Sequence, residues 1–191
     1  MARSRPVVAE SSLRETEHRL VATGPGWFVV NPRDTPWIER KGRGAYSEFE
    51  DFEGANESFG QLGINITVVG PGEPMAMYHY ENDQEDFLVV AGEAVLIIEG
   101  EERPLRTWDF VHCPPGTNHV IVGGGETPCV VVAVGARERS TGPDWGAYLV
   151  DEAARRHNAG VERDTTDPDE AYARFGPAGK ARDREGRLPS Y

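Results

Sequence analysis

The stretch "MYHYENDQEDFLVVAG", residues 77–92, places one histidine and several acids directly ahead of an apolar run that is typical of a buried strand. In an extended strand successive side chains point to opposite faces, so His79 and Glu81 share one face. Glu85 joins that face if the strand continues. The stretch therefore raises the question of whether His79 is a metal ligand or an ordinary polar residue beside an acidic turn.

A second stretch, "DFVHCPPGTNHVIVG" at residues 109–123, answers that question by supplying another histidine. His119 follows a tight turn of proline and glycine, which would deliver it into a barrel from an adjacent strand. Carboxylates beside a histidine inside a barrel are costly unless a cation compensates them. Two imidazoles and one or two carboxylates fit Fe(II), Mn(II), Ni(II) or Zn(II), and they leave coordination positions open to water or substrate.

Short β-rich runs separated by turn residues organise the middle of the chain, and they predict a single antiparallel sandwich or barrel over residues 26–138. Residues 1–25 form an N-terminal arm, and in its first 20 or so residues, through "SSLRETEHRL", we expect a mobile segment with one helical turn. Residues 139–191 form a partly helical C-terminal extension with helical segments at 147–160 and 167–176, the second capped by Asp167. The expected strands are 27–30, 62–69, 75–80, 87–90, 94–99, 110–113, 119–122 and 129–134.

Composition excludes several classes of partner. The chain has 191 residues with 32 acids against 20 bases, and its formal net charge of -12 repels phosphate backbones and anionic lipid. We therefore expect neither nucleic acid nor membrane as a partner. The absence of a long apolar run predicts a cytoplasmic protein. Cys113 and Cys129 lie in apolar strand-like surroundings, which favours free buried thiols.

The two stretches resemble the two conserved motifs of the cupin superfamily. The first motif, G(X)5HXH(X)3,4E(X)6G, is similar to the segment from Gly72 to Gly92, which carries His79, Glu81 and Glu85 in between. The second, G(X)5PXG(X)2H(X)3N, is matched at Pro114, Gly116 and His119. This resemblance implies an all-β fold, a double-stranded β-helix or jelly-roll barrel.

Two registers of the first motif are possible, and they place opposite faces of the strand inside the barrel. One puts Tyr78 and Tyr80 at the histidine positions, and the other puts His79 and Glu81 there. We prefer the second because it supplies ligands. The spacing of His79, five residues and Glu85 is then similar to that of 3-hydroxyanthranilate dioxygenase, a cupin that needs only two histidines and one glutamate.

Some positions depart from the motifs or stay open. Trp108 stands where a glycine is usual, and Gly123 replaces the terminal asparagine, so neither inherits a role. Glu81 is a fourth ligand, an acceptor that orients His79, or an exposed acid. A metal-free barrel with a hydrogen-bonded polar cluster is the alternative to a metal site. His112 is expected to be a packed or surface residue.

The resemblance implies a metal-binding single-domain cupin that holds one divalent transition metal (Fe, Mn, Ni or Zn). The leading hypothesis is an oxygenase-like small-molecule metalloenzyme, and a metal-dependent isomerase or lyase is a variant of it. A non-catalytic module that binds a metabolite or sugar is the alternative. The residues name no catalytic group, although Arg106 and Asp109 lie near the motif. An arm ahead of the barrel suits pairing by edge strands, so we expect a homodimer and a small-molecule ligand or substrate as partners.

Overall fold

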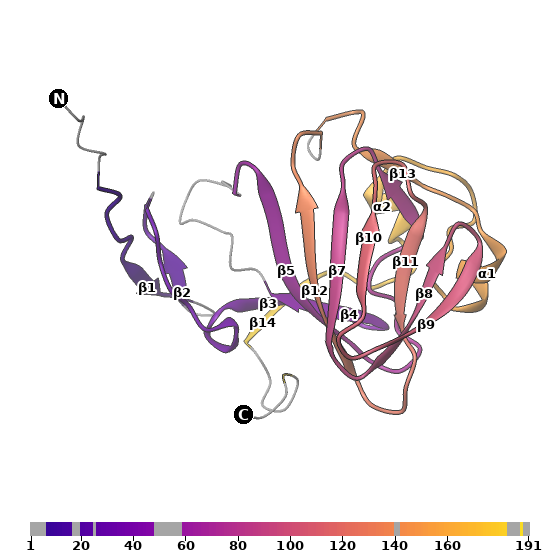
Figure 1. Cartoon of the computed structure of the whole chain (residues 1–191), viewed down its shortest axis with the longest axis horizontal. Coiled ribbons are helices and arrows are strands. Elements are labelled where there is room, and N and C mark those ends of the chain that lie inside the picture. The colour runs from indigo at the N-terminus through magenta and orange to yellow at the C-terminus, as the bar shows by residue number, and fades with distance from the viewer. Residues whose placement is uncertain are drawn as a thin grey trace.

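Two antiparallel sheets facing each other form the body of the molecule (Figure 1). The structure is a computed structural model that describes residues 7–16, 20–24, 26–47, 59–139, 142–182 and 188. In spatial order the larger sheet contains β10 (Phe110–Cys113), β7 (Glu85–Ala91), β12 (Cys129–Ala136), β5 (Leu62–Val69), β4 (Arg43–Ser47), β3 (Pro36–Arg40) and β14 (Gly179–Arg182). The smaller sheet contains β13 (Gly146–Tyr148), β6 (His79–Glu81), β11 (His119–Gly123), β8 (Glu93–Ile98) and β9 (Glu101–Arg106). This is the double-stranded β-helix expected from the sequence.

The main core lies between the two sheets, where alternate residues of each strand turn inward. Val89 and Val131 of the larger sheet are fully buried there, and Ile121 of the smaller sheet packs in the same cluster. Burying an aliphatic side chain of this size stabilises the fold by about 1.5–3 kcal/mol. Both cysteines, Cys113 and Cys129, belong to this core as free thiols, which confirms the expectation for them.

The outer face of the smaller sheet is covered by the short helix α1 (Glu152–Arg156). Ile97 and Val120 on that face pack against Ala153 and Ala154. Asp151 caps the helix by accepting a hydrogen bond from the Ala154 backbone N–H at 2.8 Å. Among the described residues, no helix is long and apolar enough to cross a bilayer.

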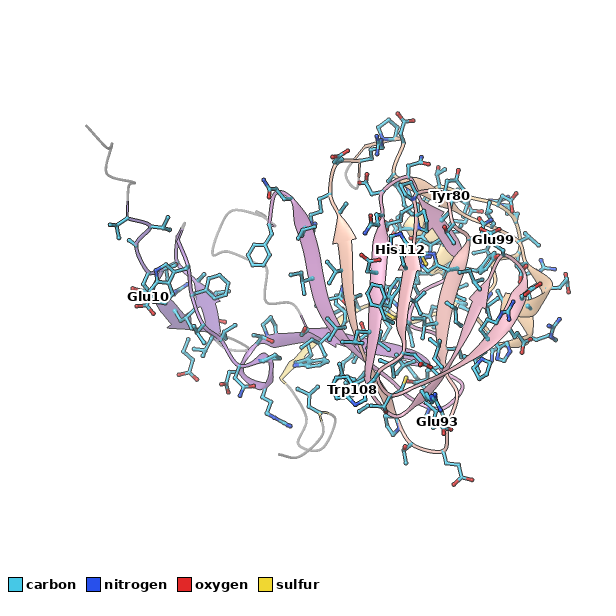
Figure 2. The ribbon with its side chains drawn as sticks, in the orientation of Figure 1. Glu10, Tyr80, Glu93, Glu99, Trp108 and His112 are labelled. Atoms are coloured by element: carbon cyan, nitrogen blue, oxygen red, sulfur yellow. The ribbon has the colours of Figure 1, made fainter. Side chains whose placement is uncertain are left out.

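Glycine is required where β7 turns into β8. Gly92 has a φ of +77°, a left-handed conformation that side chains disfavour. A Cβ at this position would also lie 2.8 Å from the Cys129 Cα. In contrast, Trp108 adopts a φ of +76° although it is not glycine. Its side chain is exposed at the turn between β9 and β10 (Figure 2).

The C-terminal extension contributes strands as well as helices. The expected helix over 147–160 is shorter, because Ala147 and Tyr148 pair with β6 as part of β13. The expected helix at 167 is α2 (Pro168–Ala171), and Asp167 caps it by accepting from the Asp169 N–H at 2.9 Å. Strand β14 then pairs with β3 and so extends the larger sheet. Pairing between distant segments overrides the local helical preference here.

The N-terminal segment also differs from the expectation. Instead of a helical turn, β1 (Leu13–Glu15) and β2 (Leu20–Ala22) form an antiparallel pair, which lies apart from the two large sheets in Figure 1. The strand expected at 27–30 is absent, since Trp27 forms only an isolated bridge with Glu10. The 3-10 helix η1 (Pro32–Asp34) leads into β3. Residues 1–6, 17–19 and 25 of the predicted arm lie outside the described residues.

Candidate metal site

The two predicted histidines face each other across neighbouring strands. His79 on β6 pairs directly with His119 on β11, and their ring centroids are 4.9 Å apart. Glu85, the first residue of β7, reaches them from the larger sheet. Its Oε2 lies 3.1 Å from the Nε2 of His119 and 3.6 Å from the Nε2 of His79. One ligand atom from each of the three residues lies within 4.8 Å of the others, so they form a candidate metal site.

The strand through His79 does not continue to Glu85, which corrects one step of the sequence reasoning. Strand β6 ends at Glu81, and β7 begins at Glu85 in the opposite sheet. Glu85 therefore meets His79 across the space between the sheets, and not by alternation along one strand.

Main-chain carbonyls fix the orientation of both imidazoles. The Nδ1 of His79 lies 2.7 Å from the carbonyl oxygen of Met77, and the Nδ1 of His119 lies 2.9 Å from that of Thr117. Because a carbonyl can only accept, each Nδ1 carries the proton and donates it. In the neutral rings, each Nε2 therefore turns its lone pair toward Glu85. This is the arrangement by which histidine ligands of metals are held.

Two atoms of this cluster are buried without a hydrogen-bond partner, namely the Nε2 of His119 and the Oε2 of Glu85. They are 3.1 Å apart but are not aligned for a hydrogen bond with each other. An unsatisfied buried polar atom costs about 1–3 kcal/mol, so a native site that holds two of them points to a missing partner. Two imidazole nitrogens and a carboxylate oxygen suit a divalent transition metal.

Without a metal, the cluster pairs an ionised carboxylate with a protonated imidazole. Burial acts to raise the pKa of Glu85, but the neighbouring His119 and His79 outweigh it and hold that pKa well below its ordinary value. Burial acts to lower the pKa of His119, but the Cys113 thiol and the Glu85 carboxylate outweigh it and raise that pKa to about 10. The carboxylate is therefore ionised at neutral pH, and a metal would displace a proton from His119.

Glu81, the fourth candidate from the sequence, lies beside the cluster but outside the compact group of three. Its Oε1 is 3.9 Å from the Nε2 of His79. Burial, followed by the charge of Glu85, raises the pKa of Glu81 to about 7. Glu81 thus lines the same cavity as a carboxyl group next to the ligands.

The tyrosines of the first motif lie on the opposite face, so the structure has the register with His79 inward. Tyr78 packs with Ile97 beneath α1, and its hydroxyl accepts a hydrogen bond from the Gly100 N–H at 3.2 Å. Burial raises the pKa of Tyr78 to about 12. Tyr80 is only partly buried.

A cavity of about 210 Å³ opens beside the three candidate ligands. Aromatic rings form part of its wall: Tyr148 lies 5.8 Å and Trp145 lies 6.3 Å from the His79 ring, centroid to centroid. Sequence reasoning missed these residues, which lie far from both motifs and carry no local signal. The missed residues that line the cavity include Arg43, Tyr46, Trp145, Tyr148 and Tyr172.

The other polar residues considered from the sequence lie elsewhere. The Asp109 carboxylate accepts from the Arg106 N–H at 2.9 Å in the turn before β10, and neither residue lines the cavity. His112 is a surface residue, as expected, and its Nδ1 lies 2.6 Å from a carboxylate oxygen of Asp86 (Figure 2).

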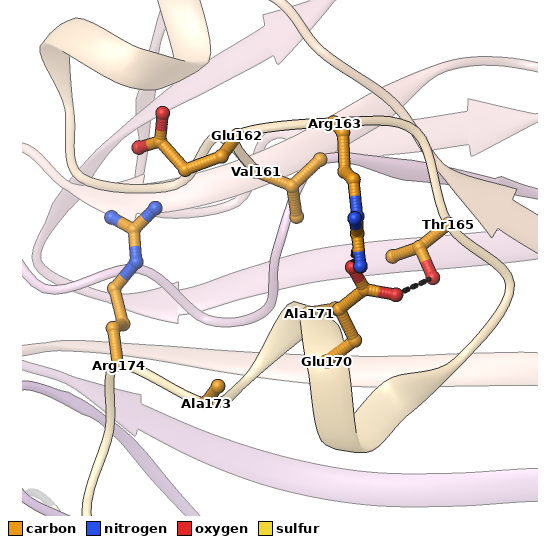
Figure 3. Close-up of a pocket in the computed structure, with 8 residues that line it drawn as sticks. All are labelled: Val161, Glu162, Arg163, Thr165, Glu170, Ala171, Ala173 and Arg174. Carbon is orange, nitrogen blue, oxygen red and sulfur yellow. Dashed lines mark hydrogen bonds and ion pairs between the residues drawn. The ribbon is translucent and has the colours of Figure 1, made fainter.

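A larger cavity of about 490 Å³ lies in the C-terminal extension (Figure 3). Its charged groups already have partners: Arg163 pairs with Glu170, which also accepts from Thr165, and Arg174 donates to the Gly160 carbonyl. These contacts hold the extension together, and among the described residues no buried side-chain atom without a hydrogen-bond partner lines this space.

Facing antiparallel sheets that enclose two histidines and a glutamate define a β-barrel protein with a candidate metal centre. Residues 65–135, a little over a third of the chain, match the model of the cupin domain. A search of curated proteins found no match to the chain.

Similar solved structures overlap the chain in part. A candidate sugar phosphate isomerase of Acidithiobacillus ferrooxidans is 28% identical, with 40% of this chain and 51% of that chain covered and a TM-score of 0.39. A sugar phosphate isomerase of Silicibacter pomeroyi is 26% identical, with 52% and 71% covered and a TM-score of 0.42. A polyketide cyclase of Streptomyces resistomycificus is 15% identical, with 58% and 79% covered and a TM-score of 0.48. The chain thus spans about half the length of the first of these proteins.

Proposed function

We propose that this chain is a metal-dependent cupin that acts on a small molecule, with His79, Glu85 and His119 holding one divalent transition metal (Fe, Mn, Ni or Zn). The observation that carries this proposal is the pair of buried atoms without partners, His119 Nε2 and Glu85 Oε2, at the edge of a cavity of about 210 Å³. When bound, the metal would supply Lewis-acid or oxygen-activating chemistry at its open coordination positions.

The chain's own residues would orient the ligands, form the cavity wall and hold a proton. The carbonyls of Met77 and Thr117 hold both imidazoles with Nε2 facing the site, so the rings need no reorientation once His119 has given up its second proton. The rings of Trp145 and Tyr148 form part of the cavity wall, where they would limit the access of water to a bound substrate. Glu81 places a carboxyl group next to the ligands, where it can hold a proton close to a bound substrate.

Within this proposal we favour an oxygenase-like reaction. The supporting feature is the ligand set itself, because two histidines and one carboxylate with open positions are typical of non-haem Fe(II) oxygenases. The spacing of His79 and Glu85, which is similar to that of 3-hydroxyanthranilate dioxygenase, agrees with this choice but does not identify a substrate.

Elemental analysis tests the metal assignment most directly. Protein purified without added metal or chelator should contain about one transition metal per chain. His119→Ala should lose it, whereas the exposed His112→Ala should keep it. Full metal content in the His119 variant would refute the assignment.

A second experiment tests the oxygenase assignment. Nitric oxide, an analogue of O₂, should change the EPR spectrum of the Fe(II)-loaded protein under anaerobic conditions, because the site has open positions. If the protein binds only Zn(II) or Mn(II) and the Fe(II) form does not respond, an isomerase or lyase would replace the oxygenase. Absence of any metal would favour the non-catalytic binding module.

A further inference from the structure

Among the described residues that line the cavity of the candidate metal site, Arg43 is the only arginine or lysine. Arg43, on β4, is half-buried, and its Nε donates a hydrogen bond to the Met75 carbonyl at 3.0 Å. Its guanidinium carbon lies 4.5 Å from the centroid of the Tyr172 ring and 5.6 Å from that of Tyr46. These contacts fix the side chain within the cavity wall.

The terminal nitrogens of Arg43 have no hydrogen-bond or ion-pair partner among the described residues. Other arginines of the described chain are paired with carboxylates, for example Arg139 with Asp83 and Arg156 with Glu102. A guanidinium that is held by stacking and leaves its donor fork unused is suited to bind a planar anion with two hydrogen bonds.

Arg43 and the candidate ligands occupy different parts of one cavity. Arg43 contacts the Tyr172 ring, whose centroid is 5.6 Å from that of Tyr148, and Tyr148 in turn contacts His79 at 5.8 Å. A molecule in the cavity can therefore meet the metal ligands at one end and Arg43 at the other. The volume of about 210 Å³ equals the space of roughly seven water molecules, which limits the molecule to a small one.

We propose that Arg43 binds the carboxylate group of the substrate, so that the substrates of this chain are small organic carboxylates. This proposal rests on the proposed function, in that it takes the cavity as the substrate site. A carboxylate carries one negative charge and matches the single charge of Arg43. A phosphate carries about two, and its second charge would be uncompensated near Glu81 and Glu85. The rings of Tyr46 and Tyr172 suit a flat apolar body attached to the acid.

The test compares matched acids and amides on metal-free protein, so its result does not depend on the metal. Benzoate and acetate, with benzamide and acetamide as uncharged counterparts, are titrated by calorimetry, and inorganic phosphate is titrated alongside them. We expect benzoate to bind more tightly than benzamide. We expect Arg43→Gln to weaken benzoate binding about 10- to 100-fold, the range for hydrogen bonds to a charged group, and Arg43→Lys to weaken it less.

Arg40→Gln is the matched control. The guanidinium carbon of Arg40 lies 5.7 Å from the centroid of the same Tyr172 ring, and Arg40 donates to the Gly176 carbonyl, but it does not line the cavity. The Arg40→Gln variant should bind benzoate with the same affinity as the unaltered protein. Equal binding of acids and amides, or unchanged benzoate affinity in a folded Arg43→Gln variant, would overturn the proposal. Tighter binding of phosphate than of either acid would overturn the carboxylate class. If His119→Ala loses the metal but still binds benzoate, carboxylate binding by Arg43 is supported independently of the metal assignment.

Discussion

Metal binding should raise the stability of the folded chain, by an amount that follows from mass action. The metal-free site leaves His119 Nε2 and Glu85 Oε2 buried and without hydrogen bonds, at a cost of about 1–3 kcal/mol each. A metal at 100 times its dissociation constant stabilises the folded state by about 2.7 kcal/mol. For a chain of this size, each kcal/mol raises the melting temperature by about 2–4 °C. The expected increase is therefore about 5–11 °C.

Differential scanning calorimetry with and without Fe(II), Mn(II), Ni(II) or Zn(II) measures this increase. His119→Ala should abolish most of it, because the variant lacks one of three ligands. Tyr78→Phe is the control: it removes a hydroxyl that accepts from the Gly100 N–H on the opposite face, so it should lower the starting stability by about 1–3 kcal/mol. Its metal-dependent increase should remain. An equal increase in His119→Ala and in the unaltered protein would refute the reasoning.

Four further predictions follow from particular residues. Glu81→Gln should weaken metal affinity about 10- to 100-fold if Glu81 acts beside the ligands, as measured by competition with a chelator; complete loss would make it a ligand. Gly92→Ala should cost about 2–4 kcal/mol in urea denaturation, whereas Gly72→Ala, with a φ of +70° and no atom within 4 Å of its Cβ, should cost about 1–2. Because the pKa of Glu85 is lowered from its ordinary value of 4.5, its ionised form stabilises the fold at pH values above 4.5, and this stabilisation is lost as the pH falls below that value. The metal-free Glu85→Gln variant should therefore lose less stability on acidification than the unaltered protein. Parallel profiles of stability against pH would contradict this prediction. Deleting residues 1–24 should shift the predicted homodimer toward monomer in sedimentation, and an unchanged mass would place the interface elsewhere.

Local patterns in the sequence determined β5 to β8, β10 to β12 and most of the ligand set, but they did not indicate β3, β4, β13 or β14. The alternation around His79 and the proline and glycine turn before His119 act over a few residues, so they can be recognised without knowing the rest of the fold. Strands β5 and β10 begin and end where the pattern predicts. By contrast, β9 was missed because it is an exposed edge strand with a proline, and its residues show no apolar alternation.

The tertiary structure alone decided how the site is completed. Glu85 belongs to it because the chain crosses from the smaller to the larger sheet after Glu81, and not because one strand continues. Arg43 comes from β4 and Tyr148 from β13, whose place beside β6 is set by pairing over more than sixty positions of the chain. The sequence by itself determined which side chains could bind a metal, since donor type and local spacing are properties of short segments. Which groups surround that metal depends on contacts between distant segments, and those arise only when the sheets pack around a common core.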